Sequence, residues 1–233
     1  MNESRQENPM RPIVTPFFHH DTFTATYLVQ DPATGAVAVV DAVLDYEPAS
    51  GRTDARAADQ IVDYVEAQGL HVEWLLETHV HADHLSAAPY LQQRLGGRIA
   101  IGEHITAIQR GFGELFNEGP AFLRDGSQFD QLFSEGDRFT IGELEARVLH
   151  TPGHTPACVS YVVGDAAFVG DTLFMPDYGT ARCDFPGGSA GDLYDSIQKI
   201  LSLPGDTRIF VGHDYKAEGR DAFAWESTVT AQH

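Results

Sequence analysis

The stretch THVHADH, residues 78–84, holds four side chains that can bind a metal ion within six positions. They are His79, His81, Asp83 and His84. A short apolar run, Val72–Thr78, leads into this stretch and is typical of a buried strand. Side chains two apart in extended backbone share a face, and a helical turn over residues 83–85 would bring the last two back toward the first two. Because imidazole and carboxylate bind first-row transition metals, the stretch predicts a metal site at a strand end.

Three later motifs repeat this arrangement, in which a predicted strand ends in a histidine or an aspartate. They are HTPGHT (150–155) with His154, FVGDT (168–172) with Asp171, and FVGHDY (210–215) with His213. Each of them alone is an ordinary turn. Strand ends on one rim of a packed sheet give rigid and convergent placement, so the four motifs together predict one metal centre.

Strand-like and helix-like segments alternate along the rest of the chain. Strands are predicted over 22–30, 36–43, 98–101, 138–141, 144–150, 158–163, 166–169 and 208–211, and helices over 52–68, 87–95, 104–109 and 192–201. We expect a flexible N-terminus, residues 1–12, and a single domain over residues 13–233. Two packed sheets with helices outside, an α/β architecture, are favoured, although periodicity alone leaves a Rossmann-like sheet open.

The composition restricts the partners of this protein. Its 233 residues include 34 acidic and 15 basic side chains, which gives a formal charge of -19. Phosphate contacts need clustered Lys and Arg, so we expect neither nucleic acid nor a membrane surface as partner. No stretch has the ~20 apolar residues of a membrane span, and no secretory signal is recognisable. Two cysteines, Cys158 and Cys183, fit a reducing compartment, and we expect a cytoplasmic protein.

The order and spacing of the four motifs resemble the metallo-β-lactamase superfamily. Three flanking stretches resemble its persulfide dioxygenase branch, and most of all the bacterial β-lactamase-like hydrolase relatives of that branch. These stretches are DAVLDY (41–46) with SGRT (50–53), TPGHTPACVSY (151–161) and TARCDF (180–185). The similarity covers nearly all of residues 13–220. It implies an αββα sandwich of the metallo-β-lactamase type, with the metal site at one edge of the two sheets.

The motif residues are compatible with one metal ion or with two. In a dinuclear zinc site, His79, His81 and His154 would bind one ion, Asp83, His84 and His213 the other, and Asp171 would bridge them. The resemblance implies instead one Fe(II) per chain, bound by the residues at positions 79, 154 and 171. Two histidines and one carboxylate leave three coordination positions open, as in non-haem iron oxygenases. We favour iron, with the other four residues orienting the ligands.

For function, the resemblance implies oxidation of glutathione persulfide, or a related low-molecular-weight persulfide, with O₂ to sulfite and thiol in sulfide detoxification. Arg182 is the candidate for binding a substrate carboxylate, because a guanidinium fits a carboxylate bidentately. An internal ion pair with Asp184 is the alternative. Tyr215 and Cys183 are further candidate substrate contacts. Cys183 replaces the usual Thr of the mitochondrial type, and the segment 111–133 is longer than its counterpart there.

The main rival is a dinuclear zinc hydrolase of the same superfamily, acting on a thioester such as S-lactoylglutathione. Enzymes of that glyoxalase II type carry a helical domain after the last metal histidine, whereas 20 residues follow His213 here, so we expect the dioxygenase. A binding-only sensor is a third alternative, but every ligand residue is present. Edge strands and exposed aromatic residues are compatible with a homodimer.

Overall fold

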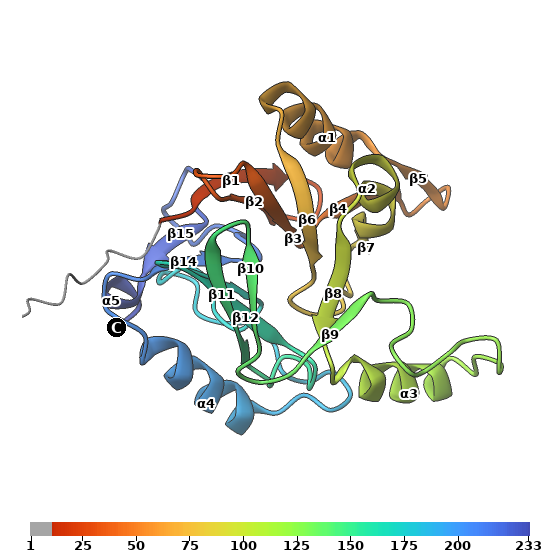
Figure 1. Ribbon diagram of the computed structural model, residues 1–233. Coiled ribbons are helices and arrows are strands. Elements are labelled where there is room, and N and C mark those ends of the chain that lie inside the picture. The colour runs from red at the N-terminus through yellow and green to blue at the C-terminus, as the bar shows by residue number, and fades with distance from the viewer. Residues whose placement is uncertain (1–10) are drawn as a thin grey trace, which may run out of the picture.

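The computed structural model describes residues 11–233, which form two six-stranded sheets packed face to face (Figure 1). The first sheet has the strand order β1-β2-β3-β6-β8-β9 and is antiparallel as far as β3 and parallel beyond it. Its strands are β1 (Ile13–His19), β2 (Thr24–Gln30), β3 (Ala36–Val40), β6 (His71–Leu76), β8 (Arg98–Gly102) and β9 (Gln131–Phe133). The expected flexible N-terminus falls almost wholly outside the described residues and stays a prediction, as do the domain bounds.

The second sheet has the strand order β10-β11-β12-β13-β14-β15, with β13 and β14 parallel and the other pairs antiparallel. Its strands are β10 (Arg138–Ile141), β11 (Leu144–His150), β12 (Val159–Val163), β13 (Ala166–Gly170), β14 (Arg208–Val211) and β15 (Glu226–Thr228). Two sheets with helices outside are the predicted α/β architecture, and the αββα sandwich is confirmed. The Rossmann-like sheet is therefore excluded.

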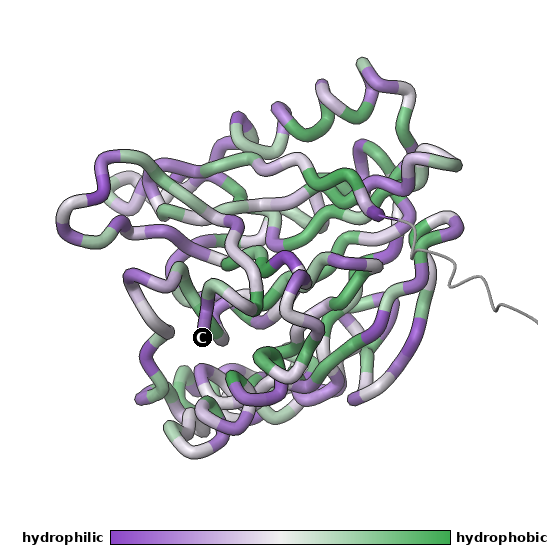
Figure 2. Tube along the Cα trace, turned by 90° about the vertical axis from the view of Figure 1, so that its left-hand side faces the viewer, coloured by the Kyte–Doolittle hydropathy of each residue, from purple (hydrophilic) through white to green (hydrophobic). Residues whose placement is uncertain are grey.

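Helices cover the outer face of each sheet, α1 and α2 on one side and α4 and α5 on the other (Figure 1). The helices are α1 (Arg56–Gln68), α2 (Ala88–Leu95), α3 (Ile105–Leu115), α4 (Ala190–Leu201) and α5 (Val229–Gln232). In the first sheet, strands β2 and β3 are buried on both faces, which explains their almost continuous apolar sequence. Tyr27 and Val29 face the second sheet, whereas Leu28 between them faces α1. Figure 2 shows hydrophobic segments mostly in the interior of the molecule and hydrophilic ones mostly in its outer turns.

Buried polar groups tie the two sheets together across the apolar core. The Tyr161 hydroxyl donates to the Glu77 carbonyl at 2.9 Å, and the Trp74 indole donates to the Thr140 carbonyl at 2.9 Å. At the far edge, the carboxylate of Asp31 accepts hydrogen bonds from the backbone amides of Ala33 and Glu143, each at 2.9 Å, and from the Thr34 hydroxyl at 2.6 Å. Burial opposes ionisation of Asp31, but these donors outweigh it and lower the pKa of the carboxyl.

Two sequence predictions about local structure are wrong. The helix predicted from residue 52 begins at Arg56, because residues 52–54 form strand β5 (Arg52–Asp54), which pairs with β4 (Val43–Glu47). The turn expected to be helical at residues 83–85 is a bend that leads into the short strand β7 (Leu85–Ser86), also paired with β4. Both errors have one cause, since the three-stranded sheet β5-β4-β7 depends on pairing between distant segments.

Helix α3 is longer than predicted and lies at the open end of the first sheet. It continues through Gly111 and Gly113 to Leu115. Its buried residues Ile105 and Ile108 pack against Ile101 of β8 and Ala157. The Arg124 guanidinium lies close to Gly113, and its Nε would lie 2.7 Å from an added Cβ. Neither Gly111 nor Gly113 ends this helix. Among the described residues no helix is both long enough and apolar enough to cross a membrane.

Candidate metal centre

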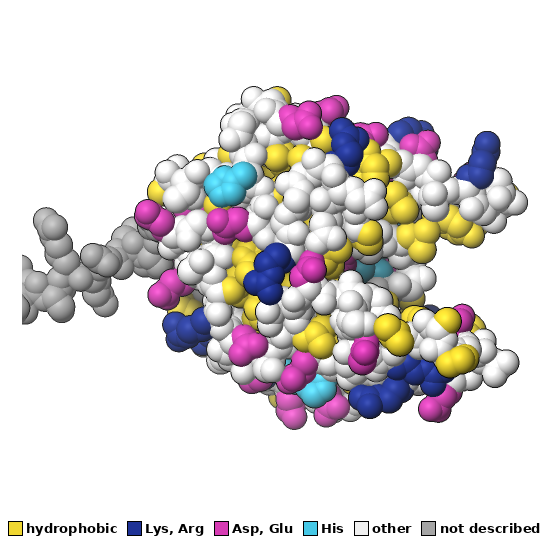
Figure 3. Space-filling model, turned by 45° about the vertical axis from the view of Figure 1, so that its right-hand side comes forward, with side chains coloured by type: hydrophobic (Ala, Val, Ile, Leu, Met, Phe, Trp, Pro, Cys, Tyr) yellow, Lys and Arg dark blue, Asp and Glu magenta, His cyan; other side chains and the backbone are white. Residues whose placement is uncertain are grey.

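The loops that follow β6, β11, β13 and β14 meet at one edge of the sandwich, as the four motifs predicted. They bring His79 from the first sheet beside His154 and Asp171 from the second. One ligand atom of each residue lies within 4.8 Å of the other two, and all three side chains are buried. Figure 3 shows a hollow between two lobes of the surface, with histidine in its depth and hydrophobic side chains along its rims.

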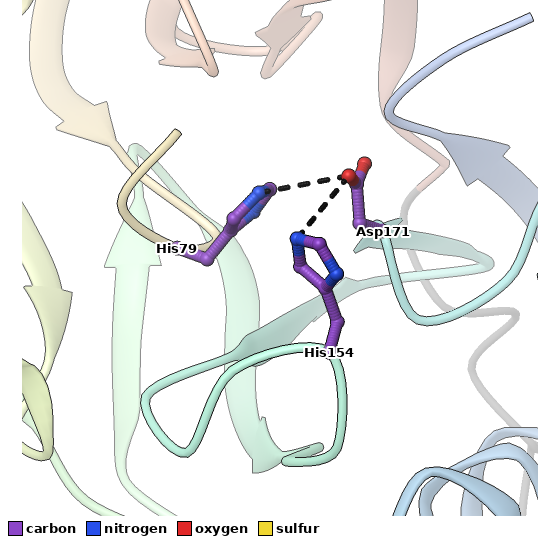
Figure 4. Close-up of side chains that lie close together, drawn as sticks. All are labelled: His79, His154 and Asp171. Atoms are coloured by element: carbon purple, nitrogen blue, oxygen red, sulfur yellow. Dashed lines mark ion pairs between the residues drawn. The ribbon is translucent and has the colours of Figure 1, made fainter. Parts of the chain in front are cut away.

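The two imidazoles of this cluster point at the same carboxylate oxygen (Figure 4). Asp171 Oδ2 lies 3.7 Å from His79 Nε2 and 3.6 Å from His154 Nε2. These separations are too long for good hydrogen bonds. They suit donor atoms arranged around a shared ion.

Neighbouring groups determine which ring nitrogen carries the proton. Nδ1 of His154 lies 2.7 Å from the Arg182 carbonyl, which can only accept, so this nitrogen donates. The Thr78 hydroxyl donates to Asp41 Oδ2 at 2.8 Å and so accepts from Nδ1 of His79 at 3.0 Å. Both rings in their neutral form therefore direct an unprotonated Nε2 toward Asp171, which is the tautomer that a metal ligand needs.

The charges of the cluster also fit a bound cation. Burial, reinforced by the neighbouring histidines, lowers the pKa of His79 well below its usual value and keeps the ring neutral. Burial raises the pKa of Asp171, whose Oδ1 has no hydrogen-bond partner among the described residues. A buried carboxylate faced by two nitrogen lone pairs is costly without a positive charge. The three residues thus fit a transition-metal ion by their chemistry.

His81 is oriented differently from His79, although the rings lie only 4.2 Å apart. Its Nε2 donates to Glu77 Oε2 at 3.1 Å and to Asp41 Oδ1 at 3.2 Å. Burial opposes a charge on this ring, but the two carboxylates outweigh burial and raise the pKa of His81 well above its usual value. The imidazole is thus held as a cation between two buried carboxylates.

The remaining motif residues form a second group of donors. One ligand atom each of His81, Asp83 and His84 lies within 4.8 Å of the other two. His81 Nδ1 and His84 Nε2 are buried without hydrogen-bond partners among the described residues, and burial lowers the pKa of His84 to about 3. His213 Nε2 lies 3.5 Å from both Asp83 Oδ2 and Asp171 Oδ1, which places this ring between the two groups.

A cavity of about 430 Å³ opens beside the first group and contains two of the three predicted substrate contacts. Arg182 lines it, but its guanidinium is bonded to both carboxylate oxygens of Asp184, at 2.5 and 2.7 Å, so the alternative ion pair is present. Tyr215 also lines it and stacks on His213 at 5.4 Å. Burial raises the pKa of Tyr215, so its hydroxyl remains a hydrogen-bond donor. Cys183 is half-buried and does not line the cavity.

Sequence reasoning missed Asp41 and Glu77, the carboxylates that hold His81. Asp41 directly follows β3 and Glu77 directly follows β6, so both are acidic residues at the ends of apolar strands. Asp41 has a positive φ of 53°, which is rare for a residue other than glycine. Acidic residues at two neighbouring strand ends were the available signal, because a buried carboxylate needs a partner.

Gly170 sets the distance between the two sheets at this site. Its φ is +50°, and an added Cβ would lie 2.3 Å from the Thr78 hydroxyl oxygen, so a side chain cannot fit here. The Thr78 carbonyl also accepts from the Val159 amide at 2.9 Å. The turn before His79 is therefore in direct contact with the turn before Asp171.

A family model described as the metallo-β-lactamase superfamily matches residues 21–213. A probable metallo-hydrolase from Burkholderia pseudomallei is 59% identical over 91% of this chain and 76% of that protein. A β-lactamase hydrolase-like protein from Agrobacterium fabrum is 58% identical over 95% of this chain, and the chain spans only 51% of its length.

Relatives whose names state a reaction are more distant. A hydroxyacylglutathione hydrolase from Bradyrhizobium is 38% identical over 82% of this chain and 62% of that protein. The mitochondrial persulfide dioxygenase ETHE1 of Homo sapiens is 31% identical over 82% of this chain and 64% of that protein. The crystal structure of ETHE1 from Myxococcus xanthus has a TM-score of 0.72 and 30% identity, and it covers 94% of this chain and 80% of that one.

Proposed function

This chain belongs to the metallo-β-lactamase superfamily, and we propose that it is a persulfide dioxygenase that holds one Fe(II). His79, His154 and Asp171 would bind the ion, which supplies redox chemistry with O₂ when it is present. The overall reaction is R–S–S⁻ + O₂ + H₂O → R–SH + SO₃²⁻ + H⁺. The terminal sulfur is oxidised, O₂ is reduced, the S–S bond breaks, and the inner sulfur leaves as the thiol.

The observation that carries this proposal is the composition of the first donor group. It contains two imidazoles and one carboxylate, all buried, with both Nε2 atoms directed at Asp171. His81 belongs to the other group, because its Nε2 is held by two carboxylates that favour a proton on the ring. Two histidines and one carboxylate with open positions are the ligand set of non-haem iron oxygenases.

The residues around the cavity would bind and orient the substrate. Tyr215 keeps its proton and can donate a hydrogen bond to an anionic sulfur or to a developing sulfite oxygen. The guanidinium of Arg182 can exchange its bond to one oxygen of Asp184 for a bond to a substrate carboxylate, since the ion pair with Asp184 is exposed. Phe174 and Phe185 form apolar walls that limit the access of water to the reacting sulfur.

The comparisons support this reaction without singling it out. A persulfide dioxygenase occurs both among the relatives and among the structural neighbours. The more similar relatives have names that state hydrolase-like activities or no substrate, and one of them is about twice as long as this chain. The activity of those whole proteins therefore enters here only as a proposal.

The second donor group favours a rival function, a dinuclear zinc hydrolase that acts on a thioester. The unpartnered His84 Nε2 would be satisfied by a second ion, and His81 Nδ1 would join it once the ion displaces the proton that Asp41 and Glu77 favour on this ring. A Bradyrhizobium relative carries the name of such a hydrolase. In that case Asp171 and the second donor group would hold two ions, which would supply the activation of water for thioester hydrolysis.

One experiment separates the two functions. The protein is purified anaerobically, its metal content is measured by elemental analysis, and oxygen uptake and sulfite are recorded after glutathione persulfide is added. About one iron per chain with oxygen uptake and sulfite formation supports the dioxygenase. Two zinc ions per chain, no oxygen uptake and cleavage of S-lactoylglutathione would establish the hydrolase instead.

A further inference from the structure

A second and larger cavity lies between α3 and the candidate metal centre. Its volume is about 530 Å³, within the range of small-molecule sites. Most of its lining is aliphatic or aromatic and comes from α3 and the segment that follows. Its lining includes the aromatic residues Phe112, Phe116 and Phe122 and the amides Gln109 and Gln128.

This cavity adjoins the cavity beside the metal ligands. Ala82, His154 and Phe185 line both of them. The Phe185 ring packs edge-on against the His154 ring at 5.3 Å, and the Arg182 guanidinium lies 4.9 Å from the Phe185 ring centre. Phe185 therefore separates a side that contains a cation from an apolar side. A substrate whose reacting sulfur lies near His154 can extend to either side.

Among the described residues, the only charge on the apolar side is the His81 imidazole, and its Nε2 is already bonded to Glu77 and Asp41. No Lys, Arg, Asp or Glu lines this cavity within the described part of the chain. Its two amides are already engaged, since Gln109 donates to the Gln128 side chain at 2.8 Å and accepts from the Gly126 amide at 3.0 Å. Gln128 in turn donates to the Leu123 carbonyl at 2.8 Å. An ammonium group buried here would lose its hydration without compensation, and a carboxylate would find only the His81 ring, which two carboxylates already bind.

We propose that this cavity binds an alkyl or aryl group on the thiol side of the substrate, so that the protein favours apolar persulfides. The proposal rests on the proposed persulfide dioxygenase function and names its substrate class. The reacting sulfur lies beside His154, and the carbon chain runs past Phe185 toward Phe112 and Phe116. Burial of each methylene in such a cavity strengthens binding about threefold to fourfold.

The first test measures binding without turnover. The full chain is titrated with butan-1-ol and with hexan-1-ol by isothermal titration calorimetry. Two added methylenes predict about tenfold tighter binding of hexan-1-ol, with a negative heat-capacity change from apolar burial. Equal affinities for the two alcohols, or no binding of either, would overturn the proposal.

Two matched pairs of variants locate the binding. Phe116 lines the cavity and is 67% exposed, whereas its neighbour Leu115 is 64% exposed and does not line it. Phe122 and Leu123 form a second pair of this kind, 37% and 53% exposed. We expect Phe116→Asp and Phe122→Asp to weaken hexan-1-ol binding about tenfold, while Leu115→Asp and Leu123→Asp leave it unchanged. If the two variants of each pair weakened hexan-1-ol binding equally, the assignment of the binding site to this cavity would be wrong. All four side chains are exposed, so their replacement by aspartate should not disturb folding.

The second test compares substrates by oxygen uptake. We expect kcat/KM to rise roughly tenfold or more from ethyl to hexyl persulfide, and Phe116→Asp to remove this rise while Leu115→Asp retains it. Uptake with glutathione persulfide but no dependence on chain length would refute the apolar site and leave the proposed function intact. No uptake with any persulfide would refute the proposed function, and the alcohol titration would still decide whether the cavity binds apolar chains.

Discussion

His79 and His81 are two residues apart, come from one loop and have rings in contact, yet their surroundings give them opposite properties. The Nδ1–H of His79 donates to an uncharged hydroxyl, and its pKa is lowered by burial. The Nε2–H of His81 donates to two buried carboxylates, and its pKa is raised. One ring presents a free lone pair to Asp171, and the other is held as a cation.

The difference shows that partners, and not residue types, decide which donors are available for a metal. Asp41, Glu77 and His81 form a set that could also hold an ion by its composition. Hydrogen bonds already connect its members, so this set stabilises the turn. The His79, His154 and Asp171 set has no hydrogen bonds between its members and needs a positive charge from elsewhere.

The largest effect is expected from Asp171→Asn, which removes the carboxylate of the unsatisfied set and keeps its volume. We expect bound metal to fall below about a tenth of the wild-type content and oxygen uptake to fall more than about a hundredfold. Metal-free Asp171→Asn should be at least as stable as the metal-free wild type, because burial raises the pKa of the replaced carboxyl.

Elemental analysis and urea unfolding of both chelated proteins measure these effects. His213→Gln is the control, since this ring lies between the two donor groups and should keep most of the iron. Full metal content in Asp171→Asn would show that the centre lies elsewhere.

The next largest effect is expected from His81→Ala, which should lower stability and leave the metal content unchanged, the reverse of Asp171→Asn. It leaves Asp41 and Glu77 buried without their cation, which should lower the free energy of unfolding by about 3–5 kcal/mol. Iron content should stay near one per chain, because His81 lies outside the set that binds it. Urea unfolding and elemental analysis test the two halves of this prediction separately. Complete loss of iron together with stability would move His81 into the first set and favour two ions.

A smaller effect is expected at Asp31, a carboxylate satisfied by hydrogen bonds far from the metal centre. Asp31→Asn should lower stability by about 2 kcal/mol at neutral pH, because the amide cannot accept from all three donors. The folded pKa of Asp31 is lowered, so its contribution is complete above the usual value of 3.8 and is lost as the pH falls below it. Urea unfolding at several pH values should show wild type and variant converging below about pH 4. A difference that grows on acidification would be inconsistent with this sign.

The smallest effect is expected from Arg182→Ala on the cation side of Phe185. Its ion pair with Asp184 is exposed, so the free energy of unfolding should hardly change. The KM for glutathione persulfide should rise roughly tenfold with kcat nearly unchanged, since a substrate carboxylate loses its partner. The KM for hexyl persulfide should not change. An equal rise for both substrates would mean that Arg182 does not distinguish the charged side from the apolar side.

The strand ends that carry the motif residues were predictable from the sequence, because apolar runs stop at these residues and strands of packed sheets converge at an edge. The residues alone left one ion or two open, and the choice of His79, His154 and Asp171 came from the family resemblance and stays a prediction. Of the two carboxylates beside His81, Glu77 is only four residues away, whereas Asp41 comes from another strand end, and no local pattern pairs it with a histidine forty residues away. Helix α3 is longer than predicted, because its buried residues Ile105 and Ile108 pack against parts of the chain that are distant in sequence.

The contact at Gly170 makes the metal centre a property of the docked sheets. His79 belongs to one half of the sandwich and Asp171 to the other, and a single hydrogen atom in place of a side chain allows their turns to touch. Neither half alone contains the three donors. The metal centre therefore forms only when the two sheets are fully docked. A chain whose sheets are separated by even the width of a methyl group keeps every ligand residue and loses the site.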